Sequence, residues 1–447
     1  MTTEIAVINR LGVALAADSA ITISGFGVQK VFDTGDKLFE LCCDHPVGIM
    51  VNGNLDFLGV PWEIIIKDFR KSEFDVPTSI EGWAQAFLAF VVQHRAVSER
   101  EVGLWMQRTV RVQLDSIRAS VRAIIDEALS RPNPPAIDPA AIYAFIISEI
   151  HRRLQEVESR PRLHSLHDLV GGGLNETIEP LIVNFLSELF ADLEFTADDR
   201  VAVEQLLSTS LLVEMSDDRS TGLIVCGFGG DDLFPSLFSV AVDGVVCGKL
   251  RYEVTHKVEI TRDPSGQDGT SKELGTAISF AQTDVIDRLL RGADHRVFAK
   301  SREFMENTIR NVCDQLFNQA GYQMQGPDGA AIDIGVFSSF LGANIAEEYD
   351  VFSGRIADTI ESEFKRTIAL MPKQELIELA EALVSITAVE RKASYDAGTV
   401  GGPIDVALIT RSEGFVWIKR KHHFRGDLNP RYMSRVLASS NQGGPAQ

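Results

Sequence analysis

Cysteine is scarce in this sequence, and no two cysteines have the spacing of a metal site. Five are scattered over 447 residues, and none forms a Cys-x-x-Cys pair: Cys42, Cys43, Cys226, Cys247 and Cys313. An odd, dispersed set of this kind disfavours both a disulfide framework and a four-cysteine zinc site. It fits a protein that works in a reducing compartment.

Long hydrophobic runs and secretory signals are also missing. Charged residues interrupt every stretch that approaches the roughly 18 apolar residues required by a membrane-spanning helix. The first four residues, Met-Thr-Thr-Glu, lack the basic region and the apolar segment of a signal peptide. We therefore expect a soluble, cytoplasmic protein with no membrane partner.

Basic residues are outnumbered, with 43 Lys and Arg against 63 Asp and Glu, which gives a formal net charge of −20. Such a chain repels a phosphate backbone on average, so nucleic-acid binding requires a local basic patch. The candidate patch is Lys419-Arg420-Lys421 followed by His422 and His423. It is short, and its neighbours are typical of the end of a strand. We expect no nucleic-acid partner.

The composition is otherwise that of a globular protein, with 45% hydrophobic and 24% charged residues. The length is about three times that of a common domain, which predicts two or three folding units. Short apolar segments separated by turn residues predict strands over 4–8, 13–17, 21–23, 28–32, 37–42, 47–51, 222–228, 237–242, 245–250, 252–260, 404–410 and 415–420.

Helical spacing of apolar residues dominates the rest of the chain. It predicts helices over 102–130, 139–158, 175–193, 197–212, 271–291 and 373–391, and mostly helical sequence over 296–370. Strands and helices therefore do not alternate regularly. This order favours antiparallel sheets stacked between helical layers.

The N-terminus carries the residues best suited to chemistry. Removal of Met1 would expose Thr2, so that a hydroxyl and a free α-amine would belong to one residue. An α-amine has a pKa near 8, so a fraction is neutral at cellular pH and can accept the hydroxyl proton. Nucleophile and base would then come from the same residue. A nearby lysine such as Lys37 would lower the pKa of the amine, and Asp18 would orient that lysine.

These residues resemble those of the proteasome β-subunit and the related bacterial heat-shock peptidase, which are N-terminal-nucleophile threonine hydrolases. Asp18 lies 16 positions after Thr2, as the acidic residue of that family does. The segment Asp36-Lys37-Leu38-Phe39 resembles the start of the family's lysine-containing strand. Residues 48–56 resemble the strand and loop that enter its first helix, which implies an oxyanion donor at the backbone N–H of Ile49 or Met50.

The resemblance implies an α+β fold, namely a four-layer αββα sandwich with a large helical insertion. Residues 1–75, 205–295 and 370–425 would form the proteasome-like core, about half of the chain. Residues 76–204 would be the helical insertion, 296–369 a mostly helical insert and 439–447 a flexible tail. The family also places an Asp and a Ser after its last helix, and Ser394, Asp396 and Thr399 are the candidates for those roles here.

The resemblance implies hydrolysis of a peptide or protein substrate, with no metal ion and no organic cofactor. It also implies a homo-oligomer and an ATPase partner that feeds the site. Two alternatives stay open. One is a catalytically silent assembly protein of the same fold, and the other is an acylase that cleaves a small amide.

Overall fold

The computed structural model describes residues 3–25, 28–95, 97–130, 138–169, 179, 182–183, 195–213, 220–263, 271–281, 284–293, 295–319, 321–325, 329, 333–393, 401–424 and 426–434. The strands are β1 (Thr3–Asn9), β2 (Gly12–Ala17), β3 (Ile21–Gly25), β4 (Val28–Phe32), β5 (Leu38–Glu40), β6 (Val47–Gly53), β7 (Asp56–Phe57), β8 (Val60–Pro61), β9 (Thr221–Gly227), β10 (Ser236–Val246), β11 (Lys249–Ile260), β12 (Ser271–Glu273), β13 (Gly275–Ala281), β14 (Asp405–Thr410) and β15 (Gly414–Lys419). The principal helices are α1 (Trp62–Phe69), α2 (Ile80–Gln93), α3 (Glu99–Leu129), α4 (Pro139–Glu158), α6 (Ala197–Leu212), α7 (Asp284–Arg291), α8 (His295–Cys313), α9 (Ile334–Leu370) and α10 (Lys373–Ala393). The predicted α+β class is confirmed.

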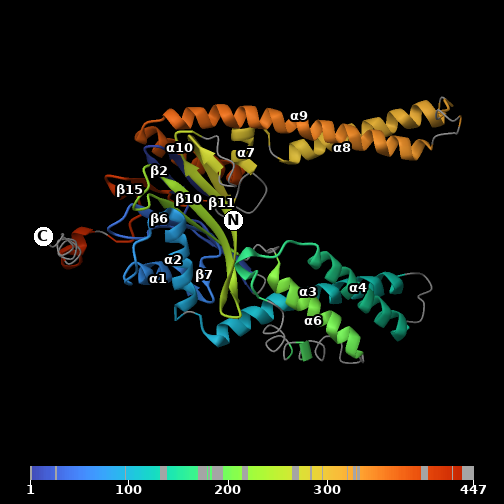
Figure 1. Ribbon diagram of the computed structural model, residues 1–447, viewed down its shortest axis with the longest axis horizontal. Coiled ribbons are helices and arrows are strands. Elements are labelled where there is room, and N and C mark those ends of the chain that lie inside the picture. The colour runs from blue at the N-terminus through green and yellow to red at the C-terminus, as the bar shows by residue number, and fades with distance from the viewer. Residues whose placement is uncertain are drawn as a thin grey trace.

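Two sheets form the body of the molecule (Figure 1). One has the strand order β13-β1-β2-β14-β15, and the other has the order β12-β11-β10-β9-β6-β5. Neighbouring strands in both sheets are antiparallel, except that β11 and β12 are parallel. Every residue of β1 and β2 is buried. This explains their nearly continuous apolar sequence, because a strand covered on both faces does not alternate between apolar and polar residues.

The two sheets share one apolar core. Ile8 and Leu15 of the five-stranded sheet belong to the same buried cluster as Met50 and Ile224 of the six-stranded sheet. Successive side chains of a strand point to opposite faces, so the other face of β1 is available to a different layer. Its Ile5 packs in a separate cluster with helical residues.

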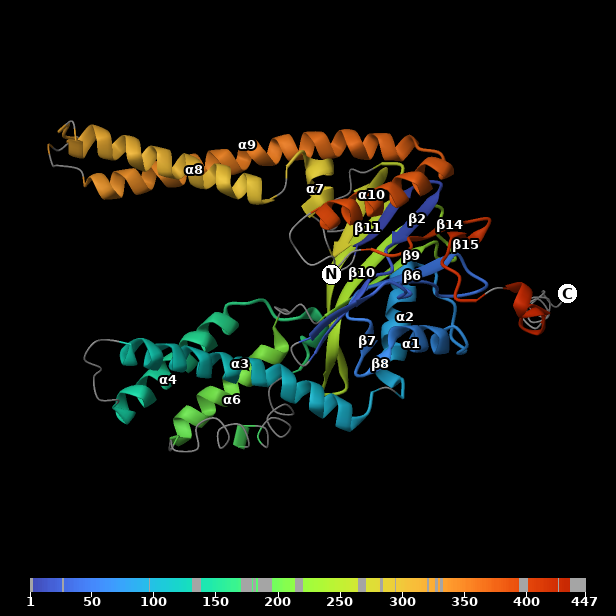
Figure 2. The ribbon, with the colours of Figure 1, turned by 180° about the vertical axis from the view of Figure 1, so that it is seen from behind.

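Helices cover the outer face of each sheet (Figures 1 and 2). Residues of α7, α10 and the end of α9 pack on the five-stranded sheet. On the six-stranded sheet, α1 and α2 contribute Trp62, Trp83 and Phe87 to another buried cluster. The body is thus built of a helical layer, two sheets and a second helical layer.

Helices α3, α4 and α6 form an arm with its own apolar core (Figure 1). Each begins at a residue whose side chain accepts a hydrogen bond from the first turn: Ser98, Asp138 and Thr196. The arm joins the body where Trp105 packs on the backbone of Gly244 in β10. A Cβ atom at Gly244 would lie 2.1 Å from the Trp105 ring, so this close approach requires glycine.

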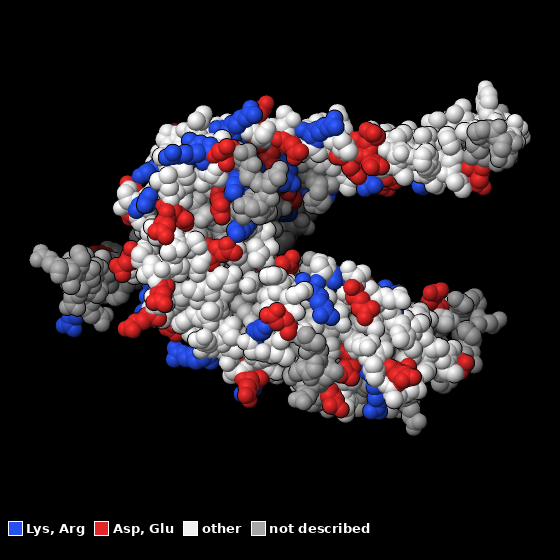
Figure 3. Space-filling view, viewed as in Figure 1, with Lys and Arg blue, Asp and Glu red and all other residues white. Residues whose placement is uncertain are grey.

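A second arm consists of α8 and most of α9, which run side by side (Figures 1 and 2). The two arms project from the same side of the body with open space between them (Figure 3). Only the C-terminal end of α9 reaches the sheet, where Ile368 is fully buried. Outward-facing residues such as Phe304 and Phe340 are about two thirds exposed, at 70% and 66%.

The predicted helix over 271–291 is wrong for most of its length. Residues 271–273 and 275–281 form β12 and β13, and only residues from Asp284 onward are helical. All seven residues of β13 pair with β1, and Phe280 enters the core between the sheets. Pairing with a strand nearly 280 residues away therefore outweighs the local helical pattern.

Other expectations fare differently. Helix α4 spans the predicted residues 139–158, and α6 spans 197–212. The predicted helix 175–193 and the tail 439–447 lie almost wholly outside the described residues. Within the described ranges, no helix combines the length and the apolar character that a bilayer span requires.

Candidate active site

Asp18 and Lys37, which the sequence places 19 residues apart, meet in the interior of the body. Asp18 directly follows β2, and Lys37 directly precedes β5. The Lys37 Nζ donates a hydrogen bond to Asp18 Oδ1 at 2.5 Å, and both side chains are at most 1% exposed. An ammonium group buried without a partner would cost several kcal/mol, so the pairing is what permits a lysine at this position.

The Asp18 carboxylate is held by the backbone as well. The Thr3 N–H donates to Oδ1 at 3.0 Å, and the N–H groups of Gly401 and Ala20 donate to Oδ2 at 3.0 and 3.3 Å. Together with Lys37, these donors match the roughly four hydrogen bonds that a carboxylate can accept. Segments from three distant parts of the chain therefore converge on Asp18.

The first described residue, Thr3, is fully buried and lies opposite Ala281 at the end of β13. Ala281 has a φ of +70°, a left-handed conformation that costs a residue with a Cβ about 1 kcal/mol or more. The Asp18 N–H also donates to the Thr3 carbonyl at 3.2 Å. The start of β1 is thus fixed on both sides.

Glu4 is a member of this cluster that the sequence analysis did not identify. Its Oε1 lies 3.1 Å from Lys37 Nζ, and its side chain is fully buried. Glu4 shares the inward face of β1 with Ala6 and Ile8, because it is an even number of residues from each. Its signal was a single charged residue within the buried, otherwise uncharged strand Thr-Glu-Ile-Ala-Val-Ile-Asn.

The proposed nucleophile, Thr2, lies outside the described residues, as does Met1. The peptide bond nevertheless links Thr2 directly to Thr3, whose N–H contacts Asp18. Ser394, Asp396 and Thr399 also lie outside the described residues. Their roles stay predictions.

Ile49 and Met50 lie within β6 and are fully buried. β6 pairs with β5 on one side and β9 on the other, so that Ile49 is opposite both Phe39 and Val225. Backbone N–H groups of a strand with two neighbours form the ladders of the sheet. An oxyanion role for either N–H stays a prediction, and we do not include it in the mechanism below.

The cysteines do not offer an alternative activated nucleophile near Lys37. Burial raises the pKa of Cys226, which lies in the core between the sheets. Burial also raises the pKa values of Cys42, Cys43 and Cys247. A thiol with a raised pKa is seldom ionised at neutral pH and is a poor nucleophile.

A cavity of about 390 Å³ lies at the junction of the α3–α4–α6 arm and the six-stranded sheet. Its lining includes Trp105, Arg108, Asp243 and Arg251. Neither Asp18 nor Lys37 lines it, so this cavity does not define where a substrate would meet the cluster.

Comparisons with known proteins do not establish a family. No family model matches the chain, and none of the curated proteins does. Among solved structures, the chain aligns with Anbu (ancestral beta-subunit) from Yersinia bercovieri, with 10% identity and a TM-score of 0.26. The alignment covers 100% of this chain and 99% of that chain. A TM-score of this size is too low to establish a shared fold, so we draw no conclusion about fold or activity from it.

Proposed function

We propose that this protein is an amide hydrolase that uses the processed N-terminal Thr2 as nucleophile and base, with a peptide or protein as substrate. The observation that carries the proposal is the buried ion pair of Asp18 and Lys37, with the Thr3 N–H bonded to the same carboxylate. Because Thr2 is covalently attached to Thr3, its amine and hydroxyl would be held within a few ångströms of that ion pair.

In the proposed reaction, the neutral α-amine of Thr2 takes the proton of the hydroxyl as the oxygen attacks the substrate carbonyl. The protonated amine then gives its proton to the leaving nitrogen, the C–N bond breaks, and an ester to Thr2 remains. A water molecule, deprotonated by the same amine, hydrolyses that ester and restores the hydroxyl. Lys37 would stabilise the negative charge that develops on the oxygen, and Asp18 would hold Lys37 in place.

The charge of the cluster supports an amine at this position. Glu4 and Asp18 bring two carboxyl groups to the single ammonium of Lys37. With both carboxyl groups ionised, the three residues carry one excess negative charge in a buried place. A protonated α-amine of Thr2 would neutralise it, which is favourable because buried charges are costly unless they are balanced.

The proposal includes the architecture expected of such a hydrolase, a four-layer αββα sandwich formed by residues 1–75, 205–295 and 370–425. The insertions 76–204 and 296–369, a homo-oligomer and an ATPase partner belong to the same proposal. The common core between the sheets and the helical layers on their outer faces support it.

A β-lactone provides a direct test. The Thr2 oxygen would open its ring, so that the whole lactone is added and the intact mass rises by that amount. We expect the purified chain to begin at Thr2, wild type to be labelled and Thr2→Ala to remain unlabelled. Lys37→Met should slow labelling about 100-fold or more, whereas Lys30→Met, on the exposed part of β4, should not.

The folded state of Lys37→Met requires a check, because it leaves Glu4 and Asp18 without their cation. The double variant Lys37→Met/Glu4→Gln restores the charge balance and should label as slowly. A chain that begins at Thr2, folds and is never labelled would contradict the proposal and favour the silent assembly protein. Labelling with cleavage of small amides but not peptides would favour the acylase.

A further inference from the structure

The basic run at the end of β15 divides into residues with different surroundings. Lys419 is 55% exposed in its side chain and contacts Glu381, and the Arg420 guanidinium lies over the ring of Trp417. Lys421, by contrast, is only 6% exposed in its side chain. A lysine is seldom buried to this extent unless its charge is paired, so the partners of Lys421 require an explanation.

All three hydrogen-bond donors of the Lys421 ammonium have partners. Its Nζ lies 3.0 Å from Ser19 Oγ and 3.0 Å from Asp36 Oδ1, and it also contacts Asp405 Oδ2. The Lys421 backbone N–H donates to the other Asp405 oxygen at 2.8 Å. His423 Nε2 lies 3.3 Å from the second oxygen of Asp36. Lys421 is therefore the centre of a buried cluster of its own.

Two of these partners are chain neighbours of the proposed active-site residues. Ser19 follows Asp18, and Asp36 precedes Lys37. The third partner, Asp405, begins β14 opposite Ala17, the residue before Asp18. One ammonium group thus bridges the segments that carry both members of the ion pair.

Backbone hydrogen bonds join the same segments. The Gly35 N–H donates to the Ser19 carbonyl at 2.9 Å, and the Ser19 N–H donates to the Gly401 carbonyl at 3.2 Å. The Ser19 hydroxyl donates to the Pro403 carbonyl at 2.6 Å while it meets Lys421. These contacts set the separation of residues 18–20, 35–37 and 401–405, and Lys421 is the charged group at their centre.

Lys421 also separates Lys37 from a competing carboxylate. Asp36 is adjacent to Lys37 in the chain, yet its carboxylate faces Lys421 and His423. Burial acts to raise the pKa of Asp36, but the hydrogen bond and charge of Lys421 outweigh it and hold that pKa below its ordinary value. Without Lys421, two ionised carboxylates would lie beside the ion pair with no lysine between them.

We propose that Lys421 is a positioning residue for the Asp18–Lys37 pair, acting through Ser19, Asp36 and Asp405. It holds the segments that carry Asp18 and Lys37 together and keeps Asp36 away from Lys37. The proposal rests on the proposed function for its effect on chemistry, whereas its effect on local structure is independent of any activity.

The experiment compares Lys421→Met with Lys419→Met, a matched change two residues away at an exposed lysine. The first readout is the rate of β-lactone labelling of Thr2 as a function of pH. We expect Lys421→Met to be slower by at least tenfold. Its half-maximal rate should also move to higher pH, because loss of a positive charge beside Asp36 and Asp405 favours the protonated α-amine. Lys419→Met should retain the wild-type rate and pH profile.

The second readout is amide hydrogen exchange, which does not require activity. Lys421→Met should exchange faster at residues 18–20 and 35–38 and should match wild type in α4. Unchanged exchange there, or a labelling rate and pH profile equal to those of wild type, would overturn the proposal. If wild type is not labelled at all, the proposed function fails, and the exchange pattern alone decides the role of Lys421. Should Lys421→Met not fold, Lys421→Met/Asp405→Asn is judged by the same two readouts.

Discussion

At the scale of single residues, the Lys37 ammonium faces two buried carboxyl groups rather than one. Asp18 is fixed by backbone donors on both oxygens, whereas Glu4 projects from the middle of an apolar strand and approaches Lys37 from another side. The two carboxyl groups therefore have different parts in the proposed chemistry. Asp18 sets the position of Lys37, and Glu4 sets the electrostatic environment of the amine at Thr2.

Glu4→Gln separates these parts. The substitution keeps the shape of the side chain and removes one negative charge near the α-amine. Because a nearby negative charge stabilises the protonated amine, its removal lowers the pKa of that amine. We expect the pH of half-maximal lactone labelling to fall by about 1 unit, measured as rate against pH. Glu40→Gln, in the strand that follows Lys37 but paired with Arg70, should leave the profile unchanged. An identical profile for Glu4→Gln would show that Glu4 does not act on the amine.

How much of the site the sequence predicts depends on what each residue contacts. Asp18 and Lys37 follow from spacing and from the resemblance, because both adjoin strands that the local pattern also predicts. Glu4 does not, because its partner is 33 residues away and only the stacking of two sheets brings them together. Lys421 was assigned to a surface patch for the same reason, since its carboxylate partners come from other strands.

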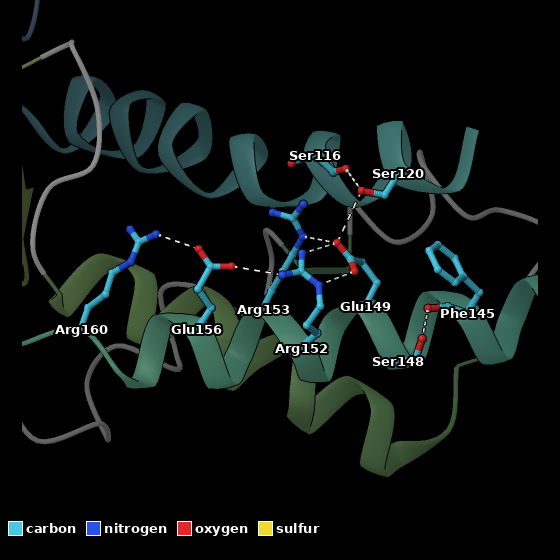
Figure 4. A network of polar contacts seen from close by, with 9 residues as sticks. All are labelled: Ser116, Ser120, Phe145, Ser148, Glu149, Arg152, Arg153, Glu156 and Arg160. Carbon is cyan, nitrogen blue, oxygen red and sulfur yellow. Dashed lines mark hydrogen bonds and ion pairs between the residues drawn. The ribbon is translucent and has the colours of Figure 1, made fainter. Parts of the chain in front are cut away.

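At the scale of elements, α4 carries an ion-pair network that links it to α3 (Figure 4). Glu149 accepts hydrogen bonds from Arg152 at 2.7 and 2.8 Å and from Arg153 at 2.9 Å. Ser120 of α3 lies 3.4 Å from the same carboxylate. The hydrogen bonds of Arg152 lower the pKa of Glu149 most, despite an opposing effect of burial, and bring it to about 2. Ionised Glu149 therefore stabilises the folded arm.

This network predicts a pH-dependent loss of stability. A carboxyl group whose pKa is lowered on folding stabilises the protein above its unfolded pKa of about 4.5, and that contribution disappears as the pH falls toward 2. We expect Glu149→Gln to lower the free energy of unfolding by about 2 kcal/mol at pH 7, allowing for screening of the exposed Arg152. The difference from wild type should shrink at pH 3, measured by chemical denaturation. Glu156→Gln, at a half-exposed carboxylate, should cost under about 0.5 kcal/mol, and equal effects at both pH values for Glu149→Gln would contradict the account.

The elements also show where local pattern suffices. Helix α4 starts after the Asp138 cap, repeats apolar residues at helical spacing and has the predicted bounds, since all of these signals are local. Strand β13 has no such signal. Its residues Gly-Thr-Ala-Ile-Ser-Phe-Ala become a strand because β1 offers a partner for all seven. A pairing between the two ends of the chain cannot be inferred from a window of neighbouring residues.

At the scale of the whole molecule, the α3–α4–α6 arm and the body have separate apolar cores joined through a small polar contact. Arg251 of β11, which is 4% exposed, makes this contact. Its guanidinium donates to the carbonyls of Leu211 and Val213 at the end of α6, both at 3.0 Å, and pairs with Asp243 of β10. A cation at the C-terminal end of a helix also interacts favourably with the helix dipole. The orientation of the arm thus depends on one residue.

Arg251→Met should loosen the arm while the body stays folded. The substitution leaves the Asp243 carboxylate and the last carbonyls of α6 without their cation, and loss of one partner of a buried pair costs about 3–5 kcal/mol. We expect faster amide exchange in α6 and in the part of α3 around Trp105, and unchanged exchange in β1 and β2. Arg251→Met/Asp243→Asn should recover part of the loss because it removes the uncompensated charge. Lys249→Met, at an exposed lysine paired with Asp168, should exchange like wild type. If exchange in β1 rises together with that in α6, the arm and the body unfold as one unit, and the Arg251 contact is part of a common core rather than a joint between two.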